Sequence, residues 1–234
     1  MSLKPIKKTD AAKPWATYND RKSPKRDERQ YILVASEDGK SSIYYFNELN
    51  TQLYKHSATL RIVPKGCGRN TQSLVNYVKK HKNEWLEAVR KDFLIDDFNE
   101  TWVLFDLDGF ASHKFDNAIT SAQSQGFQVA WSNECFELWY LLHFKDSSTP
   151  IARKDIYKEL AGLLKLKCDY TDLKGEKGKD VHVKMARNEN VGKAIKRAKK
   201  LHADPIRSDL PPHARNPCTL VFQLVEKLLK QMAN

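Results

Sequence analysis

The sequence predicts an α/β protein: a parallel β-sheet flanked by helices, followed by a basic, helical C-terminal extension. Short apolar runs alternate with amphipathic segments over residues 30–148. No polar residue interrupts the runs at 31–35 and 102–105, a pattern typical of strands that are buried on both faces of a parallel sheet. After Pro150 the pattern becomes helical. The alternation of strand and helix favours parallel strands joined by crossover helices.

The elements of the first part follow in order along the chain. The apolar runs predict strands at 31–35, 59–63, 101–105 and 127–131. Apolar residues at helical spacing predict helices near 42–55, 71–91, 112–125 and 135–144. Gly126 follows the third of these helices and is a normal C-terminal stop.

The second part is expected to be helical with two irregular connections. Helices are predicted at 153–165 and 181–202, separated by a polar loop at 169–180. A proline-rich connection then leads to a last amphipathic helix that opens with Asn216-Pro217, because proline is acceptable at the first helical position.

These patterns predict three regions. Residues 1–29 are polar and basic without periodicity, so they are expected to form a flexible arm. Residues 30–148 form the α/β domain, and 149–234 form a helical extension that packs on it. No apolar stretch is long enough to cross a membrane, and the N-terminus lacks the apolar core of a signal peptide. The cysteines form no CxxC pair, which suits a reducing, cytoplasmic setting.

The charge of the chain suggests a polyanionic partner. The formal net charge is +11, and residues 151–200 hold 15 basic and 7 acidic residues. Such an excess favours binding to nucleic acid, DNA or RNA, although a merely solvated basic surface is the alternative. The basic side chains expected to contact phosphates are Lys184, Arg187, Lys193, Lys196, Arg197, Lys199 and Lys200.

Three acidic residues follow two of the predicted strands. Glu37 follows the run at 31–35, and Asp106 and Asp108 follow the run at 102–105. Ligands of parallel α/β sheets bind beyond the carboxyl ends of the strands, so these carboxylates can converge if the two strands are neighbours. Converging carboxylates repel each other without a cation, and the hard cation Mg2+, with Mn2+ as a substitute, fits oxygen ligands. Metal-dependent phosphodiester cleavage is the chemistry that follows.

Further polar residues are candidates for the surroundings of this site. Ser132 and Asn133 end the fourth strand on the same edge, and Glu137 lies about one turn into the next helix. The last candidates, beside Glu37 itself, are Asp38 and Lys40.

The string at 105–109, Phe-Asp-Leu-Asp-Gly, resembles the nucleophile motif of haloacid-dehalogenase-type phosphatases. In that family a threonine usually follows the glycine, where this chain has Phe110, and the motif lies on the first strand rather than the third. A phosphatase of this type therefore remains an alternative. A nucleic-acid-binding module with a decayed acidic site is another.

A resemblance over nearly the whole chain points to the RloB-like family, a branch of the Toprim superfamily. Its most specific string is SNECFELWYLLHF, at 132–144. The other similar segments are YILVASEDGK at 31–40, YYF at 44–46, PKGCGRNTQSL at 64–74, VLFDLDGF at 103–110 and NPCTLVFQLVEKL at 216–228.

The resemblance implies a Toprim-like sheet that binds Mg2+ through Glu37, Asp106 and Asp108, with the glutamate as a general acid or base. It also implies a nuclease of prokaryotic anti-phage defence, related to abortive infection, with an ATPase partner. The first motif of the family commonly reads Glu-Gly-Glu-Lys-Thr-Glu. This chain has Glu-Asp-Gly-Lys-Ser-Ser at 37–42, so two of the carboxylates are replaced and Asp38 is new.

Overall fold

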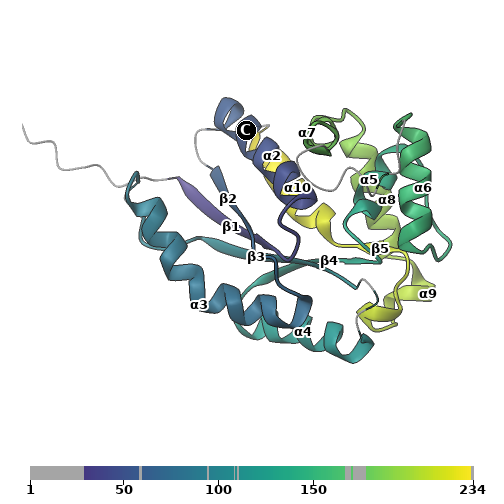
Figure 1. Ribbon diagram of the computed structural model, residues 1–234, viewed down its shortest axis with the longest axis horizontal. Coiled ribbons are helices and arrows are strands. Elements are labelled where there is room, and N and C mark those ends of the chain that lie inside the picture. Colours follow the sequence, from purple (N-terminus) through teal and green to yellow (C-terminus); the bar gives the residue numbers. More distant parts are fainter. Residues whose placement is uncertain are drawn as a thin grey trace, which may run out of the picture.

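A five-stranded sheet forms the centre of the computed structural model, which describes residues 29–57, 60–93, 95–107, 109, 111–166, 170 and 178–232 (Figure 1). The strand order is β2-β1-β3-β4-β5. The first four strands run parallel, and β5 pairs antiparallel with β4. The strands are β1 (Gln30–Ser36), β2 (Leu60–Gly66), β3 (Glu100–Asp106), β4 (Gln128–Asn133) and β5 (Cys218–Thr219). The predicted α/β fold is confirmed, with a mixed rather than a wholly parallel sheet.

Helices cover both faces of the sheet. In Figure 1, α3 and α4 lie below the sheet, whereas α2 and α10 lie above it. The helices are α2 (Ser41–His56), α3 (Thr71–Arg90), α4 (Ser112–Ser124), α5 (Glu137–Phe144), α6 (Arg153–Leu163), α7 (Lys179–Ala186), α8 (Val191–His202), α9 (Pro205–Ser208) and α10 (Val221–Met232).

The apolar run of β1 is unbroken because its side chains contribute to two cores. Side chains of a strand alternate between its faces. In β1, Ile32 and Val34 belong to the core between the sheet and α2, α5 and α10. Tyr31 and Leu33 belong to the core between the sheet and α3 and α4. A strand covered on both sides therefore has no polar face.

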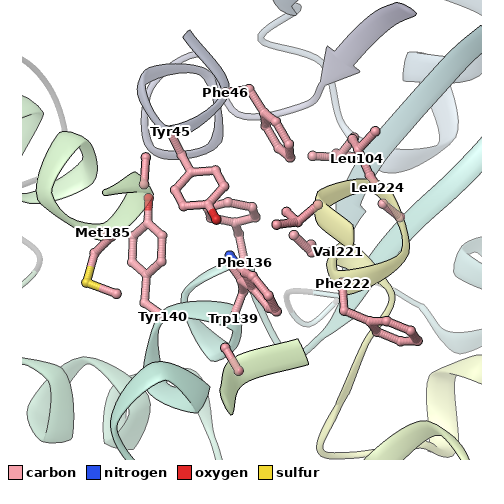
Figure 2. Packing of buried hydrophobic residues seen from close by; sticks show 14 of the residues in the cluster. Tyr45, Phe46, Leu104, Phe136, Trp139, Tyr140, Met185, Val221, Phe222 and Leu224 are labelled. Atoms are coloured by element: carbon pink, nitrogen blue, oxygen red, sulfur yellow. The ribbon is translucent and has the colours of Figure 1, made fainter. Parts of the chain in front are cut away.

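The larger core unites the two halves of the chain. Figure 2 shows Phe46 and Leu104 beside Val221 and Leu224 of α10. Helices α6, α7 and α8 also supply buried side chains to this cluster. The C-terminal helices therefore share one core with the sheet.

The last helix begins later than the sequence suggests. The predicted start at Asn216-Pro217 is wrong, because Cys218 and Thr219 pair with Asn133 and Ser132 as strand β5, and the helix begins at Val221. A strand of two residues is too short to show a periodicity.

The predicted basic helix at 181–202 is two helices. Between α7 and α8 the side chain of Asn188 accepts a hydrogen bond from the backbone N–H of Asn190, at 2.8 Å. Asparagine favours such turns over a continuing helix, which accounts for the break.

No helix in the described ranges is both long and apolar enough to span a membrane. The expected arm, up to residue 28, lies outside the described residues, as do Asp108 and most of the loop expected at 169–180.

Candidate active site

Glu37 and Asp106 lie at the same edge of the sheet because β1 and β3 are neighbours. Asp106 is the last residue of β3, and Glu37 comes directly after β1. The backbone N–H of Glu37 donates to the carbonyl oxygen of Leu104 at 3.1 Å, which continues the strand pairing up to the acid. The condition for convergence of the two acids, that their strands are neighbours, is therefore met.

These two acids line one small pocket at the carboxyl edge of the sheet. Its volume is about 150 Å3. Side chains from both halves of the chain form its wall: Glu37, Asp38, Ser41, Arg69, Asp106, Phe136, Glu137, Arg153 and Tyr157. Four of them are acidic and two are arginines, so the pocket combines opposite charges at close range.

Thr71 links the two acids. Its Oγ1 lies 2.8 Å from Glu37 Oε2 and 3.1 Å from the backbone carbonyl oxygen of Asp106. Thr71 is buried at the start of α3, so its hydroxyl is fixed by the helix. This contact holds the ends of β1 and β3 in register around the pocket.

A close backbone contact holds the loop of Glu37 against the end of β2. A Cβ atom on Gly66 would lie 2.6 Å from the Cα of Gly39, a distance at which atoms overlap. The backbone N–H of Cys67 donates to the carbonyl oxygen of Ser36 at 2.9 Å. Only glycine permits this approach, so the 66–68 turn is a packing element beside the acids.

The environment of Asp106 disfavours its charged form. Burial raises the pKa of Asp106 well above its usual value, and the carboxylates of Glu37 and Glu137 raise it further. A hydrogen bond from the Phe136 backbone and the charge of Arg153 act in the opposite direction. The guanidinium of Arg153 lies 3.9 Å from Asp106 Oδ2.

Glu137 enters the pocket from the start of α5 and is 4% exposed. Burial, and next the Glu137 carboxylate, raises the pKa of Tyr140, Tyr157 and Tyr170. These phenols therefore stay protonated and can donate hydrogen bonds. Tyr157 lines the pocket itself.

The donor set fits a hard divalent cation. Mg2+ in proteins is commonly held by one or two carboxylates and completes its shell with waters and substrate phosphates. Glu37 and Asp106 supply two such carboxylates, and Glu137 lines the same pocket. Within the described part of the chain, no three His, Cys, Asp or Glu side chains are arranged as a complete metal site.

Of the other residues predicted around the site, Asp38 lines the pocket, whereas Lys40, Ser132 and Asn133 do not. Asp38 lines the pocket and also accepts hydrogen bonds from the backbone N–H groups of Lys40 and Ser42, at 2.8 and 3.3 Å. Lys40 is exposed at the start of α2 and is not among the residues that line the pocket.

Ser132 and Asn133 end β4 on the expected edge, but other contacts occupy their side chains. The Ser132 hydroxyl pairs with that of Thr219 at 2.9 Å. Asn133 Nδ2 donates to the carbonyl oxygen of His213 at 2.7 Å. Both residues are fully buried and are not among those that line the pocket.

Local patterns did not predict Arg69, Thr71, Arg153 and Tyr157. Arg69 and Thr71 follow the glycine turn, whose position after a strand was a usable signal. Arg153 and Tyr157 come from α6, which is distant in sequence. Helical periodicity identified α6 but carries no information about which part of the sheet it contacts.

The predicted phosphate-contacting side chains lie on α7, α8 and the turn between them. Lys184, Lys193, Lys196 and Lys200 are exposed. The others are engaged within the protein. Arg197 donates to the carbonyl oxygen of Leu142 at 2.8 Å, Arg187 contacts Glu48 at 2.7 Å, and Lys199 contacts Glu226 at 2.6 Å.

The sequence was also compared with known proteins. The family model described as "RloB-like protein" matches residues 32–228. Searches of curated proteins and of solved structures returned no match.

Proposed function

The chain belongs to the RloB-like family, and on this premise we propose that it is a Mg2+-dependent nuclease whose active site is the acidic pocket. The observation that carries the proposal is the meeting of Glu37 and Asp106 in one pocket with Arg69 and Arg153. Carboxylates bind the metal, and guanidinium groups bind phosphate. A pocket that holds both can bring a metal ion and a phosphate together for phosphodiester cleavage.

Each side chain has a role that follows from its surroundings. Asp106 and Glu37 would hold Mg2+, as would Asp108, which lies outside the described residues. When bound, the ion neutralises phosphate charge and activates water. Glu37 also accepts or donates the proton of the reaction, and Thr71 fixes the orientation of its carboxylate through the 2.8 Å contact.

The remaining side chains hold the substrate. Arg153 is 26% exposed, so its guanidinium can contact a phosphate oxygen while it stays near Asp106. The protonated hydroxyl of Tyr157 can donate to another oxygen of the same phosphate. Arg69 is exposed at the mouth of the pocket and meets the adjoining phosphate.

The biological setting is part of the same proposal. The sequence resemblance supports a Toprim relationship, in which the glutamate and aspartates of the two strand ends form the catalytic centre. It also supports a role in prokaryotic anti-phage defence beside an ATPase partner, with DNA or RNA as the substrate.

The test is cleavage of labelled single- and double-stranded DNA and RNA with Mg2+ or Mn2+, compared with EDTA. Product should form only with the metal. Glu37→Gln should reduce the rate by about 10²–10⁴-fold, the usual contribution of a general acid or base. Asp106→Asn should abolish product, and Glu189→Gln, which changes an exposed acid outside the pocket, is the matched control.

The stability of these variants separates catalysis from folding. Asp106→Asn removes a charge that burial and two carboxylates disfavour, so the metal-free variant should melt at the same temperature or higher. Mg2+ should raise the melting temperature of the parent and not of the variant. Nucleic-acid cleavage by Asp106→Asn at the parent rate contradicts the proposal. Turnover of p-nitrophenyl phosphate that survives Glu37→Gln identifies a dehalogenase-type phosphatase instead.

A further inference from the structure

A stripe of aromatic rings runs along α3 from the mouth of the acidic pocket. Tyr77, His81 and Trp85 follow one another at intervals of four residues, so they lie on one side of the helix. The ring centroids of Tyr77 and His81 are 4.2 Å apart, and those of His81 and Trp85 are 6.2 Å apart. These three residues are named the α3 stripe.

The stripe connects to the pocket through Arg69. The guanidinium of Arg69 lies 4.7 Å from the centre of the Tyr77 ring, and Arg69 also lines the pocket. The stripe is therefore continuous with the acidic site. Over the eight residue steps from Tyr77 to Trp85, it extends about 12 Å along the helix at the usual rise.

The stripe is partly open to solvent, unlike the core rings beneath it. Tyr77, His81 and Trp85 are all half-buried, and the His81 side chain is 27% exposed. Trp85 also packs on the core beneath α3, which fixes its position. His81 and Arg69 contact the Tyr77 ring, and the part of the three rings that remains exposed is the surface that a flat ligand can reach.

The charges beside the stripe favour an anionic ligand. Lys80 is exposed next to Tyr77 and His81 and has no acidic partner among the described residues. Arg69 adds a second exposed cation at the end nearest the pocket. Glu84, an acid on this side, contacts His81 Nδ1 at 2.9 Å and is 72% exposed, so the two cations outnumber it.

We propose that the α3 stripe binds single-stranded nucleic acid, with bases stacked on its rings and phosphates on Arg69 and Lys80, and directs the strand into the pocket. Single strands are bound by such a combination of aromatic platforms and cations, because every base has a flat face to stack. The bases of a duplex are already stacked on one another and do not reach the rings. This inference deepens the proposed nuclease function and rests on it for the direction of the strand.

The test measures binding with the full chain carrying Asp106→Asn, which prevents cleavage. The probes are a labelled 12-nucleotide thymidine homopolymer, its uridine counterpart and a 12-base-pair duplex. Tyr77→Leu keeps the apolar volume and removes the aromatic face. It should weaken binding of the single strands by about five-fold or more, the effect of losing one stacked base. Duplex binding should change by less than about two-fold.

Tyr54→Leu is the matched control. Tyr54 is exposed on α2 and has a guanidinium over its ring, that of Arg61 at 4.0 Å, as Tyr77 has Arg69. Its removal should leave all three affinities unchanged. Single strands should also quench tryptophan fluorescence in the parent, and Trp85→Phe, which keeps a ring at this position, should remove most of that quenching.

Three results would overturn the inference. The Asp106→Asn chain does not bind single strands, Tyr77→Leu in that chain leaves its affinity for single strands unchanged, or Tyr77→Leu lowers the affinity for single strands and for the duplex equally. A Tyr77→Leu protein with a lowered melting temperature is replaced by His81→Leu, for which the same criteria hold. If binding depends on Tyr77 but the unsubstituted chain shows no metal-dependent cleavage, the α3 stripe binds single strands and the proposed nuclease function is wrong. If the chain cleaves nucleic acid but binding does not depend on Tyr77, the nuclease function stands and the role of the stripe is wrong.

Discussion

His143 shows how burial sets the chemistry of one residue. It is 1% exposed in α5, and its Nδ1 lies 2.9 Å from the carbonyl oxygen of Trp139. Burial lowers its pKa to about 4, with a further contribution from the charge of Arg197. The imidazole is therefore neutral in the folded protein at physiological pH and acts as a hydrogen-bond donor within the helix.

This residue predicts a pH dependence of stability. Below its usual pKa of 6.5, His143 of the unfolded chain takes up a proton, whereas the folded chain does not until about pH 4. The free energy of unfolding should therefore fall as the pH falls from 6.5 to 4, by about 3 kcal/mol from this group. Urea unfolding at several pH values measures it. His143→Asn should flatten the curve over this window, whereas the substitution of exposed His113 should not.

The acids of the site were predictable individually, but their neighbours were not. Glu37 and Asp106 follow buried strands, and this position alone predicts a place at the carboxyl edge. Ser132 and Asn133 also end a buried strand, but their side chains form hydrogen bonds within the protein. Their partners, the Thr219 hydroxyl and the His213 carbonyl oxygen, lie some 80 positions later in the chain. A local pattern carries no information about such contacts.

At the scale of elements, α8 presents a basic surface on the opposite side of the sheet from α3. Ala194, Ala198 and Leu201 bury one side of α8 in the larger core, which leaves its lysines in solvent. A solvated face and a phosphate-binding surface have the same appearance, so a measurement has to distinguish them.

Changing Lys193, Lys196 and Lys200 together to Glu should weaken nucleic-acid binding regardless of sequence. The log–log dependence of affinity on salt should become shallower by about 0.7–0.9 for each phosphate that the protein no longer neutralises. Lys55→Glu, at the exposed C-terminal end of α2, is the control. Unchanged affinity and salt dependence in the triple variant would mean that α8 is only a solvated surface.

The four parallel strands and most helices were predictable because their periodicities extend over several residues. The exceptions are short or turn-forming. The two residues of β5 pair with β4 and show no pattern of their own, and the Asn188 turn interrupts a segment whose composition is helical throughout. Pairing with β4 makes residues 218–219 a strand, and the side-chain hydrogen bond of Asn188 ends the helix before α8.

At the scale of the whole molecule, the last described helix, α10, packs against α2 and the sheet from the first part of the chain. Val221, Phe222, Leu224, Val225 and Leu228 of α10 are buried against α2 and the sheet. Each costs about 1.5–3 kcal/mol to expose, and together they approach the ~5–15 kcal/mol that stabilises a typical domain.

A chain ending at residue 148 should therefore not fold cooperatively. Its thermal unfolding, followed by circular dichroism, should show a broad transition or none, whereas the full chain should show a single sharp one. A sharp transition in the shortened chain would instead define 30–148 as an independent domain.

The chemistry of strand β2 bears on how copies of this protein can associate. It forms the edge of the described sheet opposite β5, and its register places Pro64 beside Val34 and Lys65 beside Ala35. Proline offers no amide hydrogen to an incoming strand, and a lysine on an edge makes close approach of another sheet costly. This edge therefore disfavours the addition of a strand from another copy. We expect any self-association to occur through helices or loops instead.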